Sequence, residues 1–240
     1  FCLKQITNNH VTTLYHMVKI VARGQFFPAN KWLGVSAMFN RSFMTLVRMY
    51  RDYMIQQNLP NGSGELDIKL WTAYLKAIFT LANNKLTYLI KLGIIARKGV
   101  YRIMGNVKER AADLLNSSWD ALACQKYEVD CGTRFGIEKI GPYQMQILED
   151  NVGLMQEIFL FAFHRHIECI KVSCRLLWCS AITCWSTYGN LQPLLNIAIP
   201  ELYNAYQTGR LYLTDYDLQR FKICTLYTVH IARDDPIYQL

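Results

Sequence analysis

The sequence is poor in glycine and proline, the two residues that most often form tight turns and end regular structure. Among its 240 residues there are 13 glycines and 6 prolines. So few turn residues argue against a fold of many short strands and favour long helices. The hydrophobic content of 52% also excludes a disordered chain.

Formal charge is missing from the whole stretch between Leu176 and Pro200. A helix that crosses a membrane needs about 20 consecutive apolar residues. Here several hydroxyl and amide side chains interrupt the run, and "YGNLQP" has the composition of a turn. We therefore expect the end of one apolar helix, a turn and the start of another helix, without a membrane span.

The paired cysteine spacing of zinc sites is also missing. Eight cysteines are spread along the chain, a lower density than in small disulfide-rich scaffolds, and they are Cys2, Cys124, Cys131, Cys169, Cys174, Cys179, Cys184 and Cys224. The four from Cys169 to Cys184 are five residues apart, so on a helix each turns roughly 140° from the last. His164 and His166 also face different ways on a helix. We expect free buried thiols in a reducing cytosol and no metal site.

No sequence signature of catalysis or phosphate binding is found. "GTRFGIEKIG" contains glycines but lacks the GxxxxGK[ST] order of a phosphate-binding loop. No defensible nucleophile, base and acid arrangement appears either. We therefore expect a segment without catalytic residues and without a cofactor. Because the chain opens at Phe1 without methionine, we expect residues 1–240 to be one segment of a larger protein.

The clearest helix is predicted in "ELDIKLWTAYLKAIFTLANN", from Glu65 to Asn84, where apolar residues recur at steps of three and four. Ile68, Trp71, Leu75 and Ile78 form one stripe, and a second stripe of Leu70, Tyr74, Ala77 and Leu81 lies beside it. A helix that is apolar on two sides touches neighbours on both, as interior helices of repeat proteins do.

Further helices are predicted along the rest of the chain. The expected helices cover residues 11–24, 30–58 and 105–123, then a run from 143 to 188 that folds back at Gly153 and at His164 to His166, and a last pair over 191–206 and 216–231. In the second of these, Trp32, Val35, Phe39, Leu46, Met49 and Tyr53 are assigned to the buried side. Residues 124–142 are expected to be a surface loop. The predicted fold is all-α, with stacked antiparallel helix pairs in an armadillo- or HEAT-like solenoid; a compact helical bundle is the alternative.

Positive charge exceeds negative charge by eight, with 26 Lys and Arg against 18 Asp and Glu. The excess is concentrated in what we call the basic cluster: Lys85, Lys91, Arg97, Lys98, Arg102, Lys108 and Arg110. Such a cluster can bind anionic lipid headgroups or an acidic partner surface, or it can be an ordinary solvated helix face. Nucleic acid is not expected, because no reading motif accompanies the charge.

Three stretches resemble the dedicator-of-cytokinesis (DOCK) family of guanine-nucleotide exchange factors. "ELDIKLWTAYLKAIFTLANNKL" is similar to the helix that begins "FELQLW" in that family. "ECIKVSCRLLWCSAITCW" and "NIAIPELYNAYQTGRLYLTDYDLQRF" resemble later helices of the same region, in the same order and at similar spacing.

The resemblance implies the armadillo-like helical region between the lipid-binding and the catalytic DOCK homology regions. It implies a parent that activates Rho-family GTPases, with Rac as the expected target, in cytoskeletal signalling and with an ELMO-type adaptor. The parent's exchange machinery would lie C-terminal to this segment, and the parent would be cytoplasmic and recruited to the plasma membrane. The alternative from the residues alone is a freestanding HEAT- or armadillo-type adaptor in protein trafficking.

Overall fold

The computed structural model describes residues 6–24, 28–59, 65–84, 92–123, 125–126, 139–149, 153–164, 166–211 and 213–228. The chain divides into two compact units, Phe1–Leu115 and Asn116–Leu240. A stacked repeat fold can be divided between any two neighbouring repeats, because each repeat contacts only its neighbours. The prediction that residues 1–240 form a single helical segment therefore stays a prediction.

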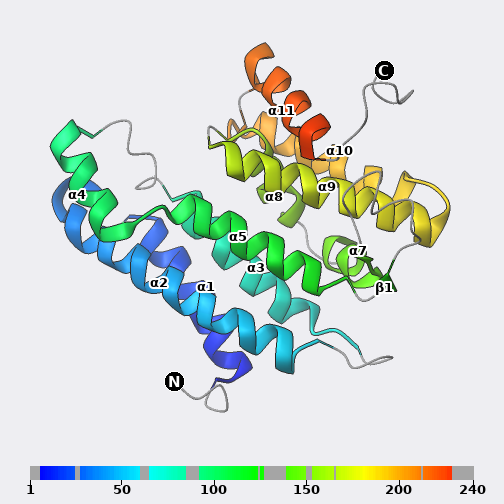
Figure 1. Cartoon of the computed structure of the whole chain (residues 1–240), viewed down its shortest axis with the longest axis horizontal. Helices are drawn as coiled ribbons and strands as arrows, with labels where there is room; N and C mark the ends of the chain where they lie inside the picture. Colours follow the sequence, from blue (N-terminus) through cyan, green and yellow to red (C-terminus); the bar gives the residue numbers. More distant parts are fainter. Residues whose placement is uncertain are drawn as a thin grey trace. The chain divides into compact units, whose positions relative to one another are not determined.

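The first unit is built from helices that alternate between two layers (Figure 1). It contains α1 (Asn8–Ala22), α2 (Ala29–Gln57), α3 (Ile68–Ala82), α4 (Ile94–Met104) and the first part of α5 (Val107–Ala121). α1 packs chiefly against α3, and α2 packs chiefly against α4, while α2 also contacts α1 and α3. α1 and α3 therefore belong to one layer, and α2 and α4 belong to the other.

The second unit repeats this alternation. It contains the end of α5, β1 (Gln125–Lys126), β2 (Lys139–Ile140), α7 (Pro142–Glu149), α8 (Leu154–Ala162), α9 (Ile167–Tyr188), α10 (Gln192–Gln207) and α11 (Asp215–Thr228). α9 contacts both α7 and α11, and α8 contacts α10. α9 also packs on α8 and α10, which join the two layers. The predicted all-α fold of stacked helices is confirmed.

The interior of the first unit is centred on α3, as its two predicted stripes indicated. Leu70, Trp71, Tyr74, Leu75 and Ile78 are all buried. Asp67 begins the helix by accepting a hydrogen bond from the Leu70 backbone nitrogen at 3.0 Å. The buried indole N–H of Trp71 donates to the carbonyl of Asn58 at 2.9 Å. Asn58 directly follows α2, so this bond satisfies the indole and joins α3 to the end of α2.

The buried face of α2 differs from the predicted one. Trp32 is exposed and lies in a non-helical kink near the start of α2, and Phe39, Leu46 and Met49 are only half-buried. Tyr53 is buried as predicted, and the interior is otherwise lined by Ser36, Ala37, Asn40, Phe43, Met44, Val47 and Met54. The prediction was wrong for the other positions because two buried residues are polar. Asn40 can be buried since its amide donates to the Ser36 carbonyl at 2.8 Å.

The predicted breaks in the run from residue 143 to 188 are confirmed. Gly153, in the left-handed conformation with φ 95°, precedes α8, and His166 precedes α9. α9 then ends at Gly189, which is also left-handed with φ 68°. α10 follows and continues through Pro200 as one helix. Among the described residues, no helix is long and apolar enough to span a membrane.

Part of the predicted loop over residues 124–142 is ordered differently from the expectation. Gln125 pairs with Ile140 and Lys126 with Lys139 in an antiparallel ladder, and Pro142 already belongs to α7. These strands were not predicted, because a ladder of two residues on each side is too short to show strand alternation in the sequence. Residues 124 and 127–138 lie outside the described residues.

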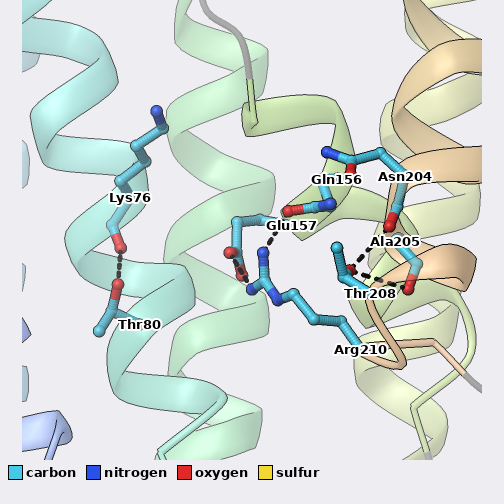
Figure 2. A network of polar contacts seen from close by, with 8 residues as sticks. All are labelled: Lys76, Thr80, Gln156, Glu157, Asn204, Ala205, Thr208 and Arg210. Atoms are coloured by element: carbon cyan, nitrogen blue, oxygen red, sulfur yellow. Dashed lines mark hydrogen bonds and ion pairs between the residues drawn. The ribbon is translucent and has the colours of Figure 1, made fainter.

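A hydrogen bond and an ion pair connect the chain just after α10 to α8, as Figure 2 shows. Gly209 adopts a left-handed conformation with φ 65°, which turns the chain so that Arg210 points back to α8. The Arg210 guanidinium donates to the Gln156 amide oxygen and, at 2.7 Å, to the Glu157 carboxylate. Figure 2 also shows a local bond in α3, where the Thr80 hydroxyl donates to the Lys76 carbonyl at 2.7 Å.

Candidate functional site

The basic cluster centres on α4, which is anchored on one side only. Val100 and Met104 are buried, and α4 packs against α2. The Arg41 guanidinium of α2 donates to the Ile103 carbonyl at 3.3 Å, so a side chain of α2 occupies one of the carbonyls that a helix end leaves unpaired. The opposite side of α4 faces solvent.

Three bases of the cluster belong to α4. Arg97, Lys98 and Arg102 are all exposed. Lys98 and Arg102 are four residues apart and therefore neighbours on one helix face. The Arg97 guanidinium donates to the Leu92 carbonyl at 3.2 Å, which holds that charge close to the first turn of α4. The structure thus brings these three predicted residues together.

The remaining bases are divided. Lys85 and Lys91 lie outside the described residues, whereas Arg110 is exposed and Lys108 is half-buried at the start of α5. Gly105, with φ 69° and ψ −166°, separates α4 from α5. A Cβ placed on Gly105 would lie 3.2 Å from the Arg110 guanidinium. Arg110 is therefore folded over the junction between the two helices.

The charges that α4 itself carries are of one sign. No acidic residue occurs between Asp67 and Glu109 in the sequence. Glu109 belongs to the start of α5, where the Asn106 amide donates to its carboxylate at 2.8 Å and the Glu109 backbone nitrogen donates to the Asn106 side chain at 3.3 Å. Since α4 itself carries no carboxylate, its surface has a positive potential that attracts anions.

Sequence reasoning missed large apolar side chains on the same surface. Ile94 and Ile95 are 71% and 88% exposed, and Tyr101 is 52% exposed. At about 100° per residue, Ile94, Ile95, Lys98, Tyr101 and Arg102 fall within an arc of about 120°. The only sequence signal was that these apolar residues alternate with bases rather than forming a stripe of their own. We call residues Ile94, Ile95, Arg97, Lys98, Tyr101 and Arg102 the α4 face.

A second exposed apolar surface occurs on α10. Leu195, Ile199, Tyr203 and Tyr206 are all more than a third exposed and share one side of the helix by their spacing. Sequence periodicity alone cannot distinguish such a stripe from a core face, because the same spacing serves both.

The cysteines of α9 and α11 are buried free thiols. Burial raises the pKa of Cys174 to about 12, although the Thr225 hydroxyl, which donates to its sulfur at 3.3 Å, lowers it. Burial likewise raises the pKa of Cys179 to about 12. Thiols held in the protonated form are poor nucleophiles and poor ligands. Over the described part of the chain, no group of three or more His, Cys, Asp or Glu residues could hold a metal ion.

Comparison with known proteins gives one clear relationship. No protein-family model matches the chain, and no solved structure matches it. The chain is 40% identical over 242 aligned residues to the protein named DOCK-like protein 1 of Saccharomyces cerevisiae. The match covers 99% of this chain but only 12% of the relative.

The match covers only a small part of the relative. Because the chain corresponds to about an eighth of its relative's length, the position of this segment between a lipid-binding and a catalytic region stays a prediction. The relationship itself extends far beyond the three stretches that first indicated it. The predicted resemblance is confirmed along almost the whole sequence, and the chain is a segment of a protein of the dedicator-of-cytokinesis family.

Proposed function

We propose that this chain is a non-catalytic helical scaffold within a DOCK-type guanine-nucleotide exchange factor for Rho-family GTPases, with Rac as the expected target. The observation that carries the proposal is the 40% identity over 99% of the chain to a DOCK-like protein. The two-layered helix stacking supports the scaffold part, since stacked repeats present extended surfaces and hold distant regions in register.

The proposed partners follow from the same relationship. The GTPase would be bound by the parent's catalytic region, and an ELMO-type adaptor would bind the parent as well. The parent would act in the cytoplasm and be recruited to the plasma membrane, where the exposed bases Arg97, Lys98 and Arg102 can favour the anionic inner leaflet.

Release of a fluorescent nucleotide from a panel of Rho-family GTPases tests the proposal. We expect nucleotide release from the GTPases to be no faster with this chain than with buffer. A longer DOCK-family protein that contains the segment should accelerate release from Rac-type GTPases. Clear acceleration by the chain alone would contradict the scaffold role. Failure of the longer protein on every member of the panel would contradict the exchange-factor assignment.

A further inference from the structure

We propose that the α4 face docks on an anionic membrane surface, with Ile94 and Ile95 entering the lipid interface while Arg97, Lys98 and Arg102 contact the headgroups. This inference deepens the membrane recruitment in the proposed function and rests on it. It adds an apolar contact that the basic cluster did not include, and it assigns that contact to two named side chains.

The apolar contact is indicated by how little of the two isoleucines the protein covers. At 71% and 88% exposure, Ile94 and Ile95 contribute almost nothing to the core of the first unit. Both lie in the first turn of α4, and Tyr101 follows two turns later on the same arc. Aromatic side chains with a polar tip are favoured at membrane interfaces. The helix therefore presents an apolar tip and an interfacial aromatic ring, and bases lie between them.

The charge pattern favours lipid over an acidic protein. Protein interfaces are depleted of charged residues other than arginine at their centre and have a polar rim. The α4 face has the opposite character, because exposed bases lie among its apolar side chains and α4 carries no acidic residue. Helices that lie in the interface of anionic membranes combine basic residues with exposed apolar side chains, and both contribute to binding.

The α4 face is also presented by a helix that is already anchored. Buried Val100 and Met104 fix the opposite side of α4, and the bond from Arg41 to the Ile103 carbonyl holds its last turn. Docking would therefore not require α4 to fold on the membrane, which is a cost that disordered binding segments bear.

Co-sedimentation with vesicles of phosphatidylcholine, with and without phosphatidylserine, tests the inference on the whole chain. One variant carries Ile94→Gln and Ile95→Gln, and the other carries Arg97→Gln, Lys98→Gln and Arg102→Gln. Each base near an anionic surface is worth about fivefold in affinity, so losing three should weaken binding on the order of a hundredfold at low salt. We expect the isoleucine variant to lose about tenfold, with the salt dependence unchanged.

Matched controls remove the same groups elsewhere. Ile199→Gln with Ile223→Gln removes two isoleucines that are 62% and 65% exposed, and Arg23→Gln, Lys69→Gln and Lys222→Gln removes three exposed bases. Neither control should weaken binding more than twofold, as a rough limit. Circular dichroism of each variant verifies that it is folded.

Insertion has its own readout. Tryptophan at position 101, introduced as Tyr101→Trp, should gain fluorescence quenching by brominated lipids beyond that of the parent protein, whereas Tyr203→Trp on α10 should not. Equal quenching at the two positions overturns the inference, as does binding that ignores phosphatidylserine or is unaffected by the isoleucine change. Absence of any vesicle binding would overturn it as well. Nucleotide release is measured without lipid, so these failures are distinguishable from failure of the exchange-factor assignment.

Discussion

At the scale of single residues, one buried amide joins three helices of the second unit. Gln144 of α7 is fully buried. Its amide nitrogen donates to the Trp119 carbonyl of α5 at 3.0 Å, and its amide oxygen accepts from the Thr183 hydroxyl of α9 at 3.0 Å. A buried polar group is tolerated when its partners are present and costly when one is removed.

We expect Gln144→Leu to lower the free energy of unfolding by about 2–4 kcal/mol, because the Trp119 carbonyl and the Thr183 hydroxyl lose their partner while buried. Chemical denaturation measures the change. Gln146→Leu, at an exposed position of the same helix, should change stability by less than about 0.5 kcal/mol. A double-mutant cycle with Thr183→Val should show coupling of at least about 0.5 kcal/mol; strictly additive effects would mean that the Gln144–Thr183 bond contributes nothing.

The buried thiols predict a loss of stability in alkaline solution. Desolvation raises the pKa of both Cys174 and Cys179 from 9.0 to about 12. Above pH 9 the unfolded chain therefore releases thiol protons that the folded chain still holds. Deprotonation then favours the unfolded state, so the contribution of these thiols is complete below pH 9 and is lost as the pH rises toward about 12.

Denaturation of the parent protein and of a Cys174→Ala, Cys179→Ala variant at about pH 8 and about pH 10.5 measures this effect. Both proteins will lose stability through other groups that titrate in the same range. We expect the parent to lose more than the variant over that interval. An equal loss in the two proteins would show that neither thiol titrates differently in the folded state.

At the scale of an element, α4 contains two glycines with opposite requirements. Gly99 lies in the helix interior with nothing within 4 Å of an added Cβ. Gly105 ends the helix at φ 69° and ψ −166°, a region that is almost restricted to glycine. We expect Gly99→Ala to raise the free energy of unfolding by about 0.5–1 kcal/mol, and Gly105→Ala to lower it by about 1–3 kcal/mol.

Thermal and urea unfolding, followed by far-ultraviolet circular dichroism, compare these two changes in the same helix. The added methyl group is identical, but at position 105 it would also lie 3.2 Å from the Arg110 guanidinium, so their difference combines the backbone conformation with that contact. If both substitutions changed the free energy of unfolding in the same direction, the positive φ of Gly105 would not explain the cost of the Gly105→Ala change.

The positions of the helices were largely predictable from the sequence, whereas the buried face of α2 was not. The stripes on α3 and the breaks at Gly153 and His166 follow from local spacing and from glycine conformation. The buried face of α2 could not be predicted, because Ser36 and Asn40 are buried and polar residues weaken the hydrophobic pattern. The bases of the candidate site were predicted, but the exposed isoleucines beside them were not, since exposure depends on which neighbours pack against a helix.

At the scale of the whole molecule, the sequence indicated stacked helix pairs but not the order in which they stack. α1 contacts α3 more extensively than it contacts α2, although α2 follows it directly in the chain. Such contacts join residues that are far apart in sequence, and local periodicity contains no information about them. Contacts between alternate helices recur in the second unit, although there α8 and α9, which are consecutive, also pack closely.

The distribution of cysteine gives the protein an internal chemical reporter. Seven of the eight cysteines lie in residues 116–240, and Cys2 is the exception. The five described ones are buried, and only a thiolate exposed to solvent reacts quickly with an alkylating reagent. The rate at which iodoacetamide modifies these five therefore measures how often the second unit opens. No thiol between residues 3 and 115 adds to that signal, so mass spectrometry can follow the opening of one half of an unmodified protein.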